Sequence, residues 1–257
     1  MIGLPPEVSA LFGTALWHAV VVFLRVGALV TVLPAFGERA VPARVRLAMA
    51  VAFTAIVAPA VDLVAYPADV LGFTGLAMVE TLIGAAMGFS LRLFVLALQT
   101  GGTIAAQSTS LSQILGAANA DPSPAMGHLL VVGGLALAVM TGLHVRAAEF
   151  LLLSYDIFPI GLRPEAQAMS GWGLARIAEA FSLAFLLAAP FVIASFIYNL
   201  ALGVINRAMP QLMVAFVGAP AITWGGLALL LVTAPVLLGV WVDRLNGFVD
   251  SGGQLLP

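Results

Sequence analysis

The sequence predicts an all-α integral membrane protein with about six long hydrophobic segments. The chain has 257 residues, of which 62% are hydrophobic and only 9% are charged, and its mean hydropathy is +1.11. A soluble domain is typically about half apolar and about a quarter charged, so a water-soluble fold would leave many apolar side chains exposed. Lipid or neighbouring subunits must therefore cover the chain, which we interpret as one membrane domain over residues 1–257.

Composition and motifs argue against several functions. The formal net charge is -2, every basic residue is Arg, and no run of like charge occurs, so we expect no nucleic-acid partner. Cysteine is absent, and His18, His128 and His144 lack the spacing of metal ligands. No nucleotide-binding loop and no nucleophile-elbow motif is present. We therefore expect no metal, no cofactor and no enzymatic activity.

Six segments have the roughly 20 residues that cross the hydrocarbon core, or more. In chain order they are residues 10–33, 47–64, 71–98, 129–153, 172–205 and 214–242. The first segment ends at Pro34. Residues 1–10, at the start of the chain, contain no Lys or Arg. The basic region of a cleavable signal peptide is thus missing, and we expect this helix to remain in the mature protein. The second segment has Pro59 near its end.

The third segment carries a polar stripe. Glu80, Gly84, Gly88 and Arg92 recur every four residues, so they share one helix face, and the two glycines form a GxxxG motif that suits close helix contact. Arg25 lies inside the first segment, where an unpaired charge is costly. Two interpretations are open. Arg25 and Glu80 form a proton or ion relay, or they form an ion pair at a helix or subunit interface, which we favour.

The connection between the third and fourth segments, residues 99–125, is long, almost uncharged and rich in Ser, Thr, Gln, Ala and Gly. In lipid an irregular backbone has to be buried in protein or line an aqueous cavity, so this stretch fits a plug that closes a pore. An ordinary cytoplasmic loop fits its composition equally well. The candidate plug residues are Gln107, Ser108, Ser110, Ser112, Gln113 and Asn119.

The fourth segment contains His144, Arg146 and Glu149, which we expect to form an interhelical or interfacial polar cluster rather than a catalytic pair. The last two segments contain prolines 190, 220 and 235. Because proline removes a backbone donor and clashes with the preceding turn, both segments are predicted to be kinked.

Two stretches carry a distinctive order of residues. Residues 25–46, RVGALVTVLPAFGERAVPARVR, combine an intramembrane arginine, two prolines around a glycine-containing loop, and an arginine pair. Residues 206–220, NRAMPQLMVAFVGAP, lie between the last two segments. These stretches, together with SYDIFP at residues 154–159, resemble the FliR family of the flagellar type III export gate, which has relatives in virulence injectisomes. Met213 and Ala215 depart from the family's usual Asn and Phe, so no role that depends on those two residues is carried over.

The resemblance implies a non-enzymatic subunit that helps to form and close the entry portal for unfolded flagellar export substrates. Its implied partners are FliP-like and FliQ-like subunits and a FlhB-like subunit, in the bacterial inner membrane within the flagellar basal body. The hydrophobic segments would then form bent hairpins packed mostly against other subunits. We expect structural or interface roles for Arg25, Pro34, Pro42, Arg46, Glu80, Gly84, Gly88, Arg92, Arg207, Pro210, Gln211, Gly218 and Pro220.

The main alternative is a secondary transporter or ion-coupled channel that acts alone, with the buried charges as its coupling site. Such a transporter would be expected to have related halves or paired broken helices, and the sequence contains no evident internal repeat. An intramembrane enzyme that uses His144 and Glu149 has the least support.

Overall fold

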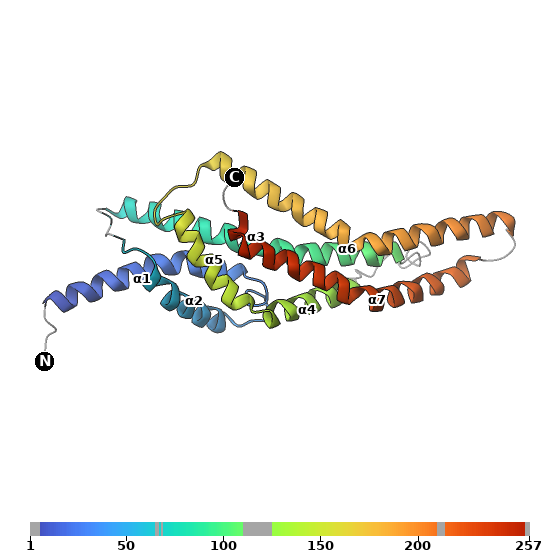
Figure 1. The fold of residues 1–257 in the computed structure, drawn as a ribbon, viewed down its shortest axis with the longest axis horizontal. Coiled ribbons are helices and arrows are strands. Elements are labelled where there is room, and N and C mark those ends of the chain that lie inside the picture. The colour runs from blue at the N-terminus through green and yellow to red at the C-terminus, as the bar shows by residue number, and fades with distance from the viewer. Residues whose placement is uncertain (1–5, 65–66, 68, 110–124, 210–213, 255–257) are drawn as a thin grey trace. The chain divides into compact units, whose positions relative to one another are not determined.

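The computed structural model describes residues 6–64, 67, 69–109, 125–209 and 214–254 (Figure 1). The α-helices are α1 (Pro6–Val32), α2 (Ala43–Val57), α3 (Val70–Thr109), α4 (Ala125–Met140), α5 (Leu143–Ile157), α6 (Ala166–Ala208) and α7 (Val214–Asp250), with short 3-10 helices η1 (Ala58–Ala60) and η3 (Gly252–Gln254). No strand occurs within these ranges. In the described part of the chain, five helices are long and apolar enough to cross a membrane, and α4 with α5 would make a sixth. The predicted all-α membrane fold is confirmed.

The chain divides into two compact units. The first consists of Met1–Arg92, Ala138–Arg176 and Leu245–Pro257. The second consists of Leu93–Leu137 and Ile177–Arg244. Each unit has its own buried side chains and is described separately.

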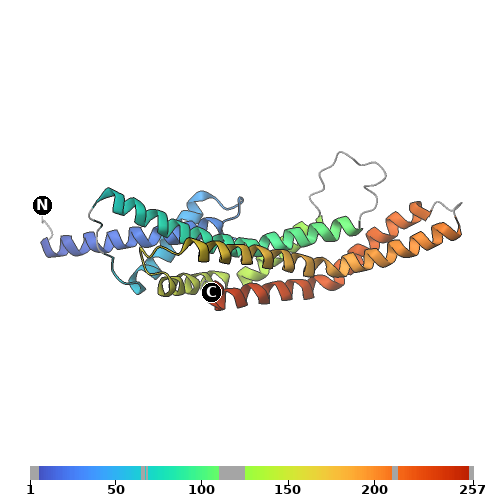
Figure 2. The same ribbon diagram turned by 90° about the horizontal axis from the view of Figure 1, so that it is seen from above.

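In the first unit, α1 and α2 lie side by side (Figures 1 and 2), and α2 also contacts α5. The turn after α1 begins close to the buried Pro34, and Pro42, with a φ of -58°, stands directly before α2. The interior is apolar, with Leu29 and Phe150 buried. The Phe150 ring also meets Phe248 edge to face at a centroid distance of 6.0 Å, a favoured aromatic geometry.

In the second unit, the later part of α6 and the early part of α7 run antiparallel (Figures 1 and 2). The Tyr198 hydroxyl donates a hydrogen bond to the Gly218 carbonyl at 2.8 Å, which links the two helices. On α3, a Cβ added to Gly102 would lie 2.3 Å from the Cα of Gly127 on α4. These two backbones therefore touch, and only glycine allows that approach.

Proline does not end the long helices. Pro190 lies inside α6, which runs for 43 residues, and Pro220 and Pro235 lie inside α7, which runs for 37 residues. Both helices are longer than the segments predicted from hydrophobicity. Pro59, by contrast, lies in η1, where the α-helix of α2 has already ended.

The fourth predicted segment is not one continuous helix. It is interrupted at Thr141 and Gly142, so that α4 and α5 are separate helices. Gly142 has a φ of 84°, in the left-handed region that glycine adopts without steric cost. Average hydropathy does not reveal this break, because α4 and α5 together are still apolar enough for one span.

The polar connection is shorter than predicted. Residues 99–109 continue α3 as regular helix, and the remaining residues up to 124 lie outside the described part of the chain. Hydroxyl groups in this stretch donate back to carbonyls of the preceding turn: Thr103 to Gln99 at 2.8 Å and Ser108 to Ala105 at 2.8 Å. These hydroxyl groups are thus satisfied within the helix, which is why they did not break it.

Candidate functional site

Arg25 is the centre of a buried polar cluster in the first unit. Its guanidinium is fully buried, and its Nε donates to Glu80 Oε2 at 2.8 Å. Nη1 donates to the Ser154 carbonyl at 3.1 Å and to the Ser154 hydroxyl at 3.2 Å, and Nη2 donates to the Phe158 carbonyl at 2.9 Å. The ring of Tyr155 lies 3.8 Å from the guanidinium carbon, within cation-π distance.

Glu80 is satisfied on both carboxylate oxygens. Besides the bond from Arg25, its Oε1 accepts the Gly161 backbone N–H at 3.0 Å. Gly161 has a φ of 81°, so the turn after α5 depends on glycine to present this amide. We name Arg25, Glu80, Ser154, Phe158 and Gly161 together the Arg25–Glu80 cluster.

The chemistry of this cluster is that of a fixed ion pair. Two opposite charges are both fully buried, and their hydrogen-bonding groups are directed at one another and at nearby backbone and hydroxyl groups. Such completeness offsets the cost of removing the charges from water. The cluster joins α1, α3, the end of α5 and the turn after it. Of the two interpretations open from the sequence, this geometry favours the ion pair over the relay.

Gly84 and Gly88 bring α3 against the backbone of α1. A Cβ added to Gly84 would lie 2.1 Å from the Arg25 carbonyl oxygen, and one added to Gly88 would lie 2.9 Å from the Leu29 carbonyl oxygen. The glycine face of α3 therefore sets the helix separation that lets the Arg25 side chain reach Glu80.

The second charged residue of the predicted stripe, Arg92, does not join this cluster. It forms a two-point ion pair with Glu38, which lies in the loop between Pro34 and Pro42. The Arg92 side chain is 30% exposed and that of Glu38 is 25% exposed. Half-exposed pairs of this kind add little stability, but the fork geometry orients the loop against α3.

The residues of the fourth segment do not gather as predicted. Arg146 pairs with Asp250 at the end of α7, whereas His144 and Glu149 are exposed. Within the described ranges, no group of three or more His, Asp or Glu side chains is placed to hold a metal ion.

Of the candidate plug residues, Gln107 and Ser108 lie in the last turns of α3 in the second unit. The Ser108 carbonyl accepts a hydrogen bond from the Ser195 hydroxyl on α6, and Asn199 in turn donates to Ser195 Oγ at 3.2 Å. The start of the polar connection is thus tied to α6. Ser110, Ser112, Gln113 and Asn119 lie outside the described residues.

The second family-like stretch is only partly described. Arg207 is exposed in the last turn of α6, Gly218 accepts the bond from Tyr198, and Pro220 lies inside α7. Pro210 and Gln211 lie outside the described residues. In the first stretch, Arg46 is half-buried on α2.

Sequence reasoning missed the partners that complete these contacts. Glu38 and Asp250 were not predicted as ion-pair partners, although each is one of few acidic residues in an apolar chain. No sequence pattern indicated the roles of the Phe158 carbonyl and the Gly161 amide, because every residue type supplies a backbone carbonyl and almost every type supplies a backbone amide. Ser154 was visible only as the first residue of the SYDIFP stretch.

Fold and site together define a helical integral membrane protein in which the buried charges of Arg25 and Glu80 pair with each other. Residues 16–248 match the family model described as "Bacterial export proteins, family 1". The chain is 35% identical to the flagellar biosynthetic protein FliR of Caulobacter vibrioides over 245 residues, which are 93% of this chain and 98% of that protein. It is 30% identical to FliR of Escherichia coli, with 83% of each chain covered, and 26% identical to FliR of Bacillus subtilis, with 77% and 79% covered. The chain belongs to the FliR family of bacterial export proteins, and is a membrane-embedded component of flagellar export.

Proposed function

We propose that this chain is a non-enzymatic subunit of the flagellar type III export gate, and that it helps to form and close the entry portal for unfolded flagellar substrates. The proposed location is the bacterial inner membrane at the flagellar basal body. Its proposed neighbours are FliP-like and FliQ-like subunits and a FlhB-like subunit. Membership of the FliR family supports this role, and no constellation that would support catalysis was found in the sequence.

The observation that carries the proposal is the apolar surface of α6 and α7. Large apolar side chains are exposed along both helices, as in Phe181, Phe185, Phe196, Leu200, Trp224, Leu231 and Val232. In one strongly apolar stretch of 18 residues, only 33% of the residues are buried in α6 and only 17% in α7. Such faces need lipid or protein against them, and a ring of helical subunits would supply it.

The polar connection is proposed to close the portal. The tie between Ser195 and the Ser108 carbonyl gives that segment a fixed starting point on a helix. In lipid, a polar stretch that follows such a helix in the sequence has to be buried in protein or line an aqueous cavity, as a plug in a lumen would.

The plug is tested by deleting residues 110–119 in the assembled complex, which leaves the described end of α3 intact. We expect a large rise in ion leakage with an unchanged yield of complex. Substitution of the exposed Glu165 by Gln, in the connection between α5 and α6, is the control and should leave leakage at the wild-type level. An assembled deletion variant that leaks no more than the control would refute the plug.

The transporter alternative is weakened by the saturated contacts of the Arg25–Glu80 cluster, since a coupling site needs a group that exchanges its ligand or proton. It is tested by reconstituting the purified chain alone in liposomes. Transport of an ion or solute by the chain without partners would overturn the gate proposal.

A further inference from the structure

Three arginines gather around the start of α2 in the first unit. Arg39 and Arg44 are exposed, Arg46 is half-buried, and none of them forms an ion pair with a side chain that the structure describes. Glu38, the acidic residue next to Arg39, is already paired with Arg92. We name Arg39, Arg44 and Arg46 the arginine rim. The rim thus has three positive charges that no described side chain neutralises.

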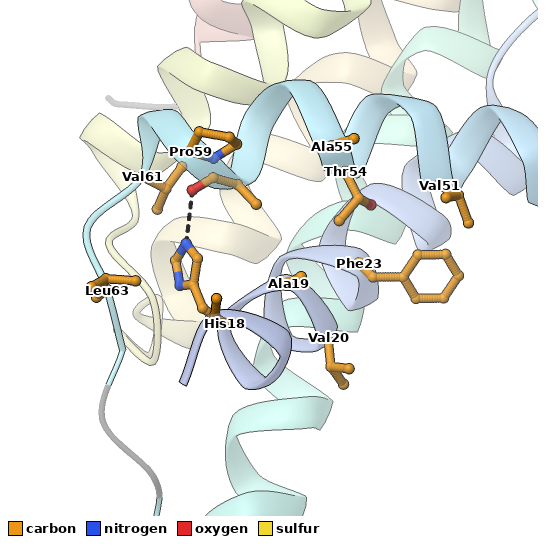
Figure 3. A pocket seen from close by; sticks show the side chains of 12 residues that line it. His18, Ala19, Val20, Phe23, Val51, Thr54, Ala55, Pro59, Val61 and Leu63 are labelled. Atoms are coloured by element: carbon orange, nitrogen blue, oxygen red, sulfur yellow. Dashed lines mark hydrogen bonds between the residues drawn. The ribbon is translucent and has the colours of Figure 1, made fainter. Parts of the chain in front are cut away.

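The rim lies where α1 ends and α2 begins. His18, early in α1, donates a hydrogen bond from Nε2 to the carbonyl of Ala58, directly after α2, at 2.9 Å (Figure 3). The two helices therefore run antiparallel. Val32, the last residue of α1, and Arg44, in the first turn of α2, stand equally far along the chain from this contact. Both helix ends are thus at one level.

Helix α3 gives the distance from the rim to the opposite end of the unit. Asp69 Oδ1 accepts the Gly72 backbone N–H at 2.9 Å, which caps the start of this helix. From Val70 to Arg92, a rise of 1.5 Å per residue gives about 33 Å. The hydrocarbon core of a bilayer is about 30 Å thick. Because Arg92 pairs with Glu38, next to the rim, the rim lies at one boundary of a layer of that thickness.

The charges at the two boundaries have opposite signs. The connection between α2 and α3, at the boundary away from the rim, carries Asp62 and Asp69, which are both exposed. Residues 47–91 contain no Lys or Arg. An anionic group is therefore attracted to the rim and repelled at the opposite boundary.

The outer face of α2 indicates what kind of anion fits. Arg44, Leu47 and Val51 follow one another at spacings of three and four residues, so they share one helix face. Leu47 is 57% exposed and Val51 is 54% exposed. The face thus has a cation at the membrane boundary and apolar side chains below it, which matches a phosphate group above an acyl chain. A free anion would use only the cation.

We propose that the arginine rim binds the phosphate of an anionic phospholipid such as phosphatidylglycerol, whose acyl chains lie along the exposed face of α2. Guanidinium groups donate paired N–H bonds to phosphate oxygens, and here they have no competing carboxylate. Phosphatidylcholine has the same phosphate, but its quaternary ammonium is repelled by the rim. The lipid site is independent of the gate proposal.

The test is native mass spectrometry of the full-length chain in detergent with phosphatidylglycerol or phosphatidylcholine of matched acyl composition. Phosphatidylglycerol should bind at least about tenfold more tightly, since each arginine near a membrane surface contributes about fivefold. Equal binding of the two lipids would overturn the proposal. An excess of soluble glycerophosphate should leave phosphatidylglycerol bound, and displacement would overturn a site that needs the acyl chains.

Arg39→Gln combined with Arg44→Gln assigns the preference to the rim. Both side chains are exposed, so the variant should fold, bind phosphatidylglycerol about 25-fold more weakly and bind phosphatidylcholine as the wild type does. Arg163→Gln is the matched control. It removes one exposed arginine in the turn after α5, where Nη2 would lie 3.4 Å from a Cβ added to Gly75 on the part of α3 away from the rim.

The control should keep the wild-type preference for phosphatidylglycerol. A double variant that also keeps it would overturn the proposal. The chain purified together with its partner subunits should retain phosphatidylglycerol at the rim. A carboxylate of another subunit paired with Arg44 in place of the lipid would assign the rim to a protein interface and overturn the lipid site.

Discussion

A buried guanidinium is compatible with an apolar helix only when its donors are used, and Arg25 meets that condition through one carboxylate, one hydroxyl and two carbonyls. The same contacts make the pair costly to break. Removing one partner leaves an uncompensated buried charge, whereas removing both leaves an apolar gap that can be filled.

At the residue scale, Glu80→Gln should lower the free energy of unfolding by about 3–5 kcal/mol, because Arg25 stays charged and buried. Thermal unfolding of the purified protein in detergent measures the loss. Glu38→Gln is the matched control, since Glu38 and its partner Arg92 are partly exposed, and it should cost less than about 1 kcal/mol. The double change Arg25→Met with Glu80→Met should recover most of the stability. Equal losses for Glu80→Gln and Glu38→Gln would contradict the assigned role of the cluster.

Helix contacts depend on glycine at the element scale. Gly84→Ala should destabilise the protein by about 1–3 kcal/mol, since the new methyl group would overlap the Arg25 carbonyl and force α1 and α3 apart. Gly173→Ala on α6 is the control, because no atom lies within 4 Å of a Cβ added there, and helix propensity predicts a gain of up to about 1 kcal/mol. The stability changes of both variants are measured by the shift in unfolding temperature. A Gly84→Ala protein as stable as the wild type would show that α1 and α3 do not touch as described.

The break between α4 and α5 gives a second prediction at this scale. Gly142→Ala should cost about 1–2 kcal/mol for conformational reasons alone, since the left-handed φ of 84° is strained for Ala and no neighbouring atom lies within 4 Å. Hydrogen exchange should increase in the first turn of α5. Gly239→Ala, in a helical position of α7 with equally open surroundings, is expected to show neither effect. Unchanged exchange and stability in Gly142→Ala would mean that α4 and α5 join without a glycine-dependent turn.

At the scale of the whole molecule, the exposed apolar faces predict that stability depends on partners. The chain purified with FliP-like and FliQ-like subunits should unfold at a higher temperature than the chain alone in the same detergent, because subunit binding stabilises the folded state by mass action. Differential scanning of the two samples measures this shift. A chain that is equally stable alone, and that does not co-purify with those subunits, would contradict an assembly role.

Much of the architecture was accessible from local information. Hydrophobic stretches longer than about 20 residues must be helical in lipid, since the backbone has to satisfy its own hydrogen bonds, so the helices around Arg25, Glu80 and Pro190 were predicted correctly. The positions of helix ends were harder to predict from the sequence. Residues 99–109 were assigned to a loop because they are polar, but their hydroxyls are satisfied by the turn before them.

The sequence by itself determined that this protein is helical, that it belongs in a membrane and that its buried charges required partners. These follow from composition, from segment length and from the cost of an isolated charge in lipid. Only the tertiary structure decided which partners those were. Arg25 and Glu80 are 55 positions apart, and Arg25 bonds carbonyls that carry no sequence signal. The break at Gly142 and the bond from His18 to the Ala58 carbonyl were decided in the same way, since each depends on how the chain bends and which helix comes to lie beside it.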